Sequence, residues 1–118
     1  MLTKKTPETI NARLRIKAMG VENDLLLTFY NRTPDEYDNF TKNPENLNVP
    51  EGVSEVVGIA YIKAAMVLFL VKSFDDGTDA EFPLNLAGLV DLERHWPGVL
   101  QGIMVGYHQA RGAQVEKN

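Results

Sequence analysis

A long apolar segment occupies the middle of the chain. From Val56 to Val71 the sequence runs for 16 residues with one charged side chain, Lys63, and one glycine, Gly58. A helix that crosses a bilayer needs about 20 apolar residues, and a lysine near its centre costs about 3 kcal/mol. We therefore expect a helix from Ser54 to about Phe74 that is buried by protein and does not span a membrane.

Such a helix is apolar on nearly every side, so its whole circumference has to be covered. A small domain covers one face well, whereas full cover calls for a second copy or a partner chain. Each buried Leu, Val, Phe or Met side chain contributes about 1.5 to 3 kcal/mol to that contact. The large side chains of the helix are therefore either core residues or contacts for another chain. The candidates are Val56, Ile59, Ile62, Met66, Phe69 and Leu70.

The composition suits one small domain, which we assign to residues 1–118. The chain is 44% hydrophobic and 24% charged, which is enough for a single core. Its net charge of -4 argues against coating nucleic acid by bulk attraction. Because cysteine is absent, disulfides, thiolate zinc sites and cysteine nucleophiles are excluded. No apolar stretch follows the first residues, so we expect no secretory signal and a cytoplasmic location.

The N-terminal part predicts a β-hairpin followed by a short helix. Apolar and basic residues alternate over residues 10–18, which is the period of a half-buried strand. Turn residues follow, and the run Leu25–Tyr30 predicts a second strand. Thr33, Pro34 and Glu36 then form a capping box that starts a helix.

The C-terminal part predicts two further helices. After a turn at residues 75–78 and an extended segment over 79–84, Asn85 caps a helix of about Leu86–Arg94. Pro97 begins another of about Gly98–Arg111. The expected fold is α+β and mainly helical, with an N-terminal β-hairpin packed against about four helices. We expect residues 1–9 and 113–118 to be flexible.

The chain contains few residues that could carry catalysis. Asp75, Asp76, Asp79 and Glu81 are close in sequence, but their spacing does not match a helix-loop-helix calcium site. His95 and His108 are not spaced to bind one metal ion from a single helix. A nucleophile elbow, a P-loop and a dinucleotide fingerprint are absent. We therefore expect no enzyme activity, no metal site and no cofactor.

Basic residues on the first strand leave an alternative function open. Arg13, Arg15 and Lys17, with Lys4 and Lys5, could contact phosphate groups. No aromatic residue lies between them to stack on bases. A solvated hairpin face is the simpler interpretation, and a small regulatory or nucleic-acid-binding module is the alternative.

Three glycines four residues apart suggest a close helix contact. Without Cβ atoms, Gly98, Gly102 and Gly106 would let another backbone approach the last helix. We expect that neighbour to be segment 54–74 of the same chain, and the same segment of another copy is the alternative. Trp96 and Tyr107 are large anchors that suit a core or an interface.

The order of these motifs resembles the tail assembly chaperones of long-tailed bacteriophages and prophages. The similarity covers about residues 25–118 and is strongest over 74–118. There an acidic glycine turn, a Phe82-Pro83 step, a Trp96-Pro97-Gly98 helix start, Tyr107 and a closing Glu-Lys-Asn occur in the order of the family. The basic hairpin is longer than in the family.

The resemblance implies a non-enzymatic protein of the bacterial host cytoplasm. Such chaperones bind the hydrophobic tape measure protein, keep it soluble and help to recruit tail tube subunits around it. They tend to self-associate, and neither a membrane nor nucleic acid is an expected partner. Their genes are often read through a frameshift, and Glu116-Lys117-Asn118 can be encoded by a slippery A-rich heptamer.

Overall fold

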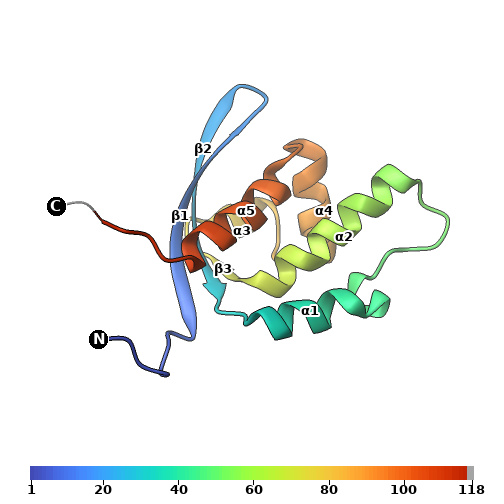
Figure 1. The fold of residues 1–118 in the computed structure, drawn as a ribbon. Helices are drawn as coiled ribbons and strands as arrows, with labels where there is room; N and C mark the ends of the chain where they lie inside the picture. The colour runs from blue at the N-terminus through green and yellow to red at the C-terminus, as the bar shows by residue number, and fades with distance from the viewer. Residues whose placement is uncertain (117–118) are drawn as a thin grey trace.

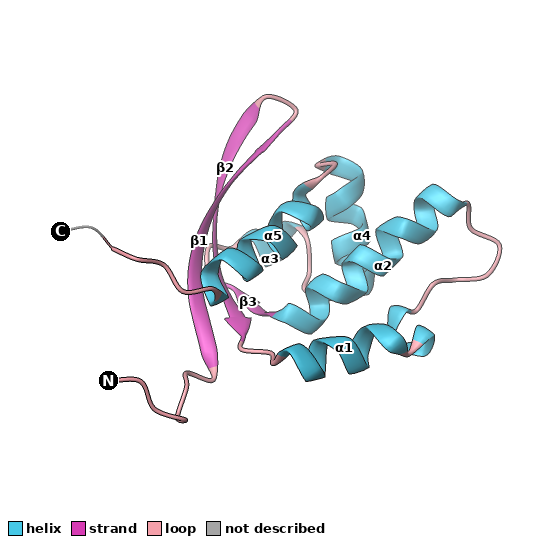
Figure 2. Cartoon of the chain, viewed as in Figure 1, coloured by secondary structure: helices cyan, strands magenta, loops and turns pink. Residues whose placement is uncertain are grey.

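A computed structural model describes residues 1–116 of the chain, and it is α+β and mainly helical, as expected (Figures 1 and 2). An antiparallel sheet of three strands lies against one side of a group of helices. In chain order the elements are β1 (Thr9–Ala18), β2 (Val21–Tyr30), α1 (Pro34–Lys42), the 3-10 helix η1 (Pro44–Leu47), α2 (Glu55–Leu70), β3 (Val71–Phe74), α3 (Thr78–Glu81), α4 (Leu86–His95) and α5 (Val99–Arg111).

The hairpin is longer than the sequence indicated, because β2 begins directly after a two-residue turn. Met19 and Gly20 both have positive φ, at 49° and 78°, which is typical of a turn that matches the twist of two paired strands. Ala18 pairs with Val21, and pairing continues to Thr9 and Tyr30. The tip of the hairpin projects beyond the helices (Figure 1).

The third strand was not expected. The apolar helix ends at Leu70, and Val71–Phe74 continue as β3, which pairs with β2 next to Leu27 and Phe29. The side chains of Val71 and Phe74 are buried there. The prediction of a helix to Phe74 is therefore wrong for its last four residues, since pairing with a distant strand outweighs the local apolar pattern.

The core lies between one face of the sheet and helices α2, α4 and α5. Leu27 and Phe29 face inward from the sheet and are 1% and 0% exposed. The ring of Phe29 meets Tyr107 of α5 edge to face, with 5.2 Å between ring centroids. Such a pair adds about 0.5 to 1.5 kcal/mol to the free energy of unfolding beyond the area that it buries.

Side-chain caps begin two of the helices as the sequence predicted. The Thr33 hydroxyl accepts a hydrogen bond from the Glu36 N–H, and the Glu36 carboxylate accepts one from the Thr33 N–H. The Asn85 side chain accepts a hydrogen bond from the Gly88 N–H at 2.8 Å and starts α4. Each cap contributes about 1 kcal/mol.

Segment 79–84 is not extended throughout, because α3 occupies its first part. The Asp76 carboxylate accepts hydrogen bonds from the N–H and hydroxyl of Thr78, at 3.0 and 2.7 Å, and this favours a helical turn.

The sheet holds the last residues of the N-terminal segment 1–9. Thr9 already belongs to β1, and Asn31 binds the carbonyls of Pro7 and Glu8. Residues 113–116 lie in neither helix nor strand. The rest of the expected segment 113–118, Lys117 and Asn118, lies outside the described residues.

Candidate protein-binding surface

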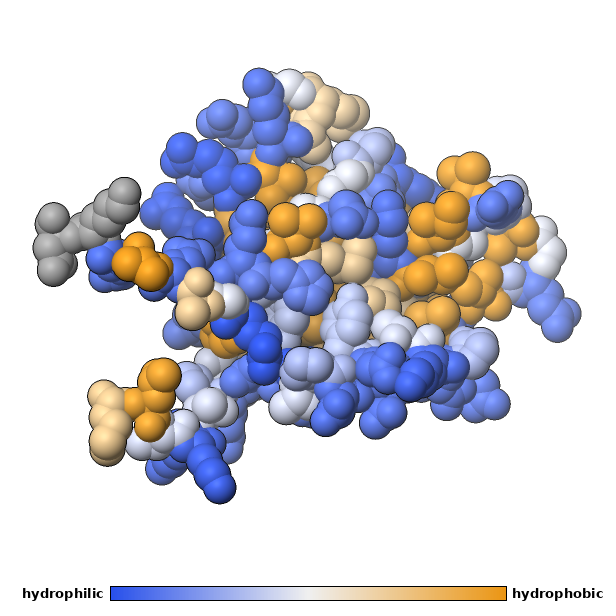
Figure 3. Space-filling view, viewed as in Figure 1, coloured by the Kyte–Doolittle hydropathy of each residue, from blue (hydrophilic) through white to orange (hydrophobic). Residues whose placement is uncertain are grey.

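Helix α2 is divided into a buried half and an exposed half. In its C-terminal half Ala64, Val67 and Leu70 are fully covered by the rest of the chain. In its N-terminal half Val56 is 78% exposed and Ile59 is 45% exposed. Apolar side chains accordingly gather on the surface over α2 (Figure 3). The chain therefore covers only part of its most apolar helix.

The structure separates the six candidate residues of α2. Leu70 and Met66 are buried, so they serve the core. Phe69 is half-buried and stacks on Phe40 of α1, with 4.2 Å between ring centroids. Val56, Ile59 and Ile62 remain accessible to another molecule.

A groove runs between the exposed half of α2 and the end of α4. We call it the α2/α4 groove, and its volume is ≈ 360 Å³. Its apolar lining comes from both sides and consists of Val56, Val57, Ile59, Ala60, Val90 and Pro97. The roles of Val90 and Pro97 were not predictable from the sequence, because their place beside α2 depends on the packing of α4.

Two cations line the α2/α4 groove together with one carboxylate. They are Lys63 and Arg94, and neither forms an ion pair with any residue in 1–116. The carboxylate of Glu93 accepts hydrogen bonds from the N–H groups of Gly98 and Leu100, at 2.9 and 3.2 Å. Its charge therefore serves the start of α5, where a helix favours an anion.

The expected glycine contact with segment 54–74 is wrong. A Cβ atom on Gly106 would lie 2.6 Å from Leu14, and one on Gly102 would lie 3.1 Å from Ile16. Both glycines therefore let α5 approach β1, because the inward side chains of the hairpin occupy the space above them. Gly98 lies outside that contact and begins α5 with a φ of 91°.

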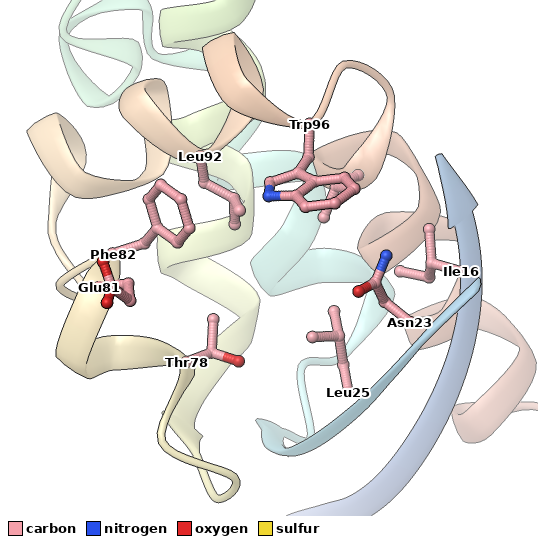
Figure 4. A pocket seen from close by; sticks show the side chains of 9 residues that line it. Ile16, Asn23, Leu25, Thr78, Glu81, Phe82, Leu92 and Trp96 are labelled. Carbon is pink, nitrogen blue, oxygen red and sulfur yellow. The ribbon is translucent and has the colours of Figure 1, made fainter. Parts of the chain in front are cut away.

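Trp96 and Tyr107 lie away from the α2/α4 groove. Tyr107 is a core residue at 2% exposure. Trp96 lines a separate pocket of ≈ 200 Å³, where Ile16 and Leu25 of the hairpin face Phe82 and Leu92 across the space (Figure 4). The structure therefore does not bring the eleven candidate residues together in one site.

The basic residues of the hairpin are balanced by acidic residues of β2. Arg13 and Arg15 both donate hydrogen bonds to Asp24, at 3.2 and 3.4 Å. These two bonds hold the pKa of Asp24 below its ordinary value. Lys17 lies directly opposite Glu22 in the register of the two strands. This balance reduces the positive charge that the nucleic-acid alternative requires.

The acidic turn holds β3 and α3 against β2. Asp75 accepts hydrogen bonds from the hydroxyls of Thr28 and Ser73, both at 2.7 Å. Asp76 accepts a hydrogen bond from the Leu26 N–H at 3.0 Å. These carboxylates therefore have a structural role in the turn.

No helix within residues 1–116 is both long enough and apolar enough to cross a membrane. Searches with the chain find no matching family model, no matching curated protein and no matching solved structure. The α2/α4 groove is therefore interpreted from its own geometry.

Proposed function

We propose that this protein is a non-enzymatic tail assembly chaperone of a long-tailed bacteriophage or prophage. It acts in the cytoplasm of the bacterial host, binds the tape measure protein and helps to recruit tail tube subunits. The proposal rests on the motif order over residues 25–118 and on the exposed apolar half of α2.

The exposure of α2 is the observation that carries the proposal. A soluble domain ordinarily buries the apolar face of a helix, and a contiguous exposed apolar surface marks an interaction site. Val56, Ile59 and Ile62 form such a surface at 78%, 45% and 36% exposure. A groove between two helices suits an amphipathic helical client, whose apolar face fits between them.

The charges of the α2/α4 groove add a preference to this apolar contact. Lys63 and Arg94 can pair with acidic residues beside the apolar face of a client helix. One groove of ≈ 360 Å³ accommodates only a few side chains. A long client is therefore held by several copies of the chaperone, whose weak contacts add through multivalency.

Co-expression with a tape measure protein tests the proposal. The wild-type chaperone should yield a soluble complex with the client. The double variant Val56→Asp and Ile59→Asp should bind about a hundredfold more weakly, because two side chains of about 1.5 kcal/mol each no longer contribute. Both residues are exposed, so the variant should fold and melt like the wild type.

Val21→Asp is the matched control for this experiment. Val21 is 49% exposed at the start of β2, close to the 45% of Ile59, but it lies outside the α2/α4 groove. This variant should retain the complex. If the client stays insoluble beside folded wild-type protein and no complex is recovered, the proposal is wrong.

Self-association is part of the proposed function and has its own test. Light scattering over a concentration series should give masses above that of the 13.2 kDa monomer. A strict monomer at the highest concentration would contradict the multivalent arrangement.

A further inference from the structure

Strand β1 is an edge strand with one partner. The sheet order is β1-β2-β3, so only β2 pairs with it. The pair Ala18 and Val21 closes the two-residue turn, and hydrogen-bonded pairs alternate with non-bonded pairs from there. The backbone N–H and C=O groups that point away from β2 are therefore those of Thr9, Asn11, Arg13, Arg15 and Lys17.

The opposite edge of the hairpin supports this assignment. Leu26 pairs with Arg13, so its own backbone groups must also point away from the hairpin. The Leu26 carbonyl accepts a hydrogen bond from the backbone N–H of Asp75, and the Leu26 N–H donates one to the carboxylate of Asp76. On the β1 side, no residue in 1–116 bonds to the five outward-pointing backbone positions.

A hollow lies beside this edge, between β1 and α5. It consists of two adjoining parts of ≈ 450 and ≈ 380 Å³, which share Arg13, Leu14, Gly106 and Gln109. An added strand would lie about 4.8 Å from β1. The hollow extends along β1 from Ile10 to Lys17, which is the length of a complete added strand.

The two faces of the edge have opposite chemistry. On the outer face are Arg13, Arg15 and Lys17, and the two arginine side chains remain 68% and 70% exposed despite their contact with Asp24. On the inner face the half-buried Leu14 and Ile16 lie beside Val105 of α5. Alternate side chains of an added strand would therefore meet cations and apolar groups in turn.

We infer that this edge of β1 binds an extended segment of a partner protein in which acidic and apolar residues alternate. The backbone groups of β1 supply the affinity of strand addition, and the two faces supply the sequence preference. Opposite charges on directly facing residues of adjacent strands contribute about 0.2 to 1 kcal/mol per pair. The surface shares no residue with the α2/α4 groove.

A second copy of this chain matches the edge less well. Pairing β1 with another β1 would set Arg13, Arg15 and Lys17 against the same cations, which is unfavourable. The outer edge of β2 has acidic residues at Glu22 and Asp24, but from Leu26 onward the turn and β3 already occupy it. Only a short stretch of β2 could therefore pair with a second copy.

A synthetic peptide in which Glu and Val alternate over seven residues tests the inference. Titration into the isotopically labelled protein should slow amide hydrogen exchange at Asn11, Arg13 and Arg15. The same peptide with Lys in place of Glu should bind at least about tenfold more weakly, because three charge pairs change sign. Dynamic light scattering of the peptide alone excludes aggregation as the source of binding.

Two protein variants separate the backbone contribution from the charges. Asn11→Pro removes one outward N–H and keeps the backbone bonds to β2, so it should weaken binding. The matched Asn11→Ala loses the same side-chain hydrogen bond from Thr28 but keeps the N–H, so it should not. Arg13→Glu with Arg15→Glu should reverse the preference between the Glu and Lys peptides. Ile59→Asp, in the α2/α4 groove, should leave peptide binding unchanged.

Several outcomes would overturn the inference. One is that the Glu and Lys peptides bind with equal affinity. Another is that the peptide slows hydrogen exchange at amides of α2 and not at amides of β1. A third is that amide exchange in β1 stays unchanged at saturating peptide. Protection of β1 that rises with protein concentration in the absence of peptide would also overturn it, because a second copy would then occupy the edge.

Discussion

The hydroxyl of Tyr107 forms two hydrogen bonds with the backbone of a single residue, Arg32. It accepts one from the Arg32 N–H at 3.0 Å and donates one to the Arg32 carbonyl at 3.1 Å. Tyr107 lies on α5, and Arg32 lies in the link between β2 and α1. One buried phenol thus joins the last helix to the segment where the chain leaves the sheet.

Replacing Tyr107 by Phe should lower the free energy of unfolding by about 1 to 3 kcal/mol. The change removes both hydrogen bonds and leaves two backbone groups of Arg32 without a partner in a partly buried place. Urea denaturation measures the loss. Tyr37→Phe is the control, because no residue in 1–116 binds the Tyr37 hydroxyl, and it should cost little. Equal effects of the two substitutions would contradict the structural role of Tyr107.

Two helical glycines should respond to alanine in opposite directions. A Cβ atom on Gly88 would lie 1.9 Å from the carbonyl oxygen of Pro83, and backbone cannot move aside as a side-chain end can. Gly88→Ala should therefore destabilise by about 2 to 3 kcal/mol. On Gly58 a Cβ atom would make ordinary contact with Val49 at 3.6 Å. Gly58→Ala should stabilise by up to about 1 kcal/mol, because alanine favours helix more than glycine does.

Thermal melting of both glycine variants checks this pair. A melting temperature that rises for Gly88→Ala would mean that α4 does not start against Pro83 as the structure shows.

Acid should weaken the turn that joins β3 to α3. The hydroxyls of Thr28 and Ser73 hold the pKa of Asp75 below its ordinary value of 3.8. Burial opposes ionisation of Asp76, but hydrogen bonds from Thr78 and Leu26 outweigh it and lower the pKa of Asp76 as well. Both carboxyls therefore release their protons more readily in the folded chain than in the unfolded chain.

The sign of the pH effect follows from these lowered pKa values. The stabilisation is complete above about pH 5, roughly one pH unit above the ordinary pKa of 3.8, and is lost as the pH falls through 3.8 to the lowered pKa values of the folded chain. Urea midpoints should drop between about pH 5 and pH 3, and less steeply for Asp76→Asn than for the wild type. Asp79→Asn changes an exposed carboxylate without a hydrogen bond in residues 1–116 and should keep the wild-type slope. If the urea midpoint of Asp76→Asn falls with pH as steeply as that of the wild type, this account of the turn is wrong.

The sequence predicted features that depend on neighbouring residues. The hairpin follows from the alternation over residues 10–18, and the helix starts follow from Thr33 and Asn85. Each of these features depends on residues that are close to one another in the sequence. The mainly helical α+β class was predictable for the same reason.

Features that depend on distant partners were not predictable in this way. Val71–Phe74 form β3 because Val71 and Phe74 pair with Phe29 and Leu27 of β2. The local sequence of these four residues would also suit a helix. Gly106 faces Leu14, more than 90 residues earlier in the chain. Val56 and Leu70 are equally apolar in the sequence, and only the packing of the other elements exposes one and buries the other.

The contact between α2 and a tape measure protein is tested most directly by photo-crosslinking in the co-expressed complex. A photo-reactive amino acid at Ile59 should give a covalent adduct with the client, and the same amino acid at the similarly exposed Val21 should not. The adduct should disappear when Val56→Asp is added. A complex that crosslinks from Val21 and not from Ile59 would contradict the assignment of the exposed half of α2 as the client-binding surface.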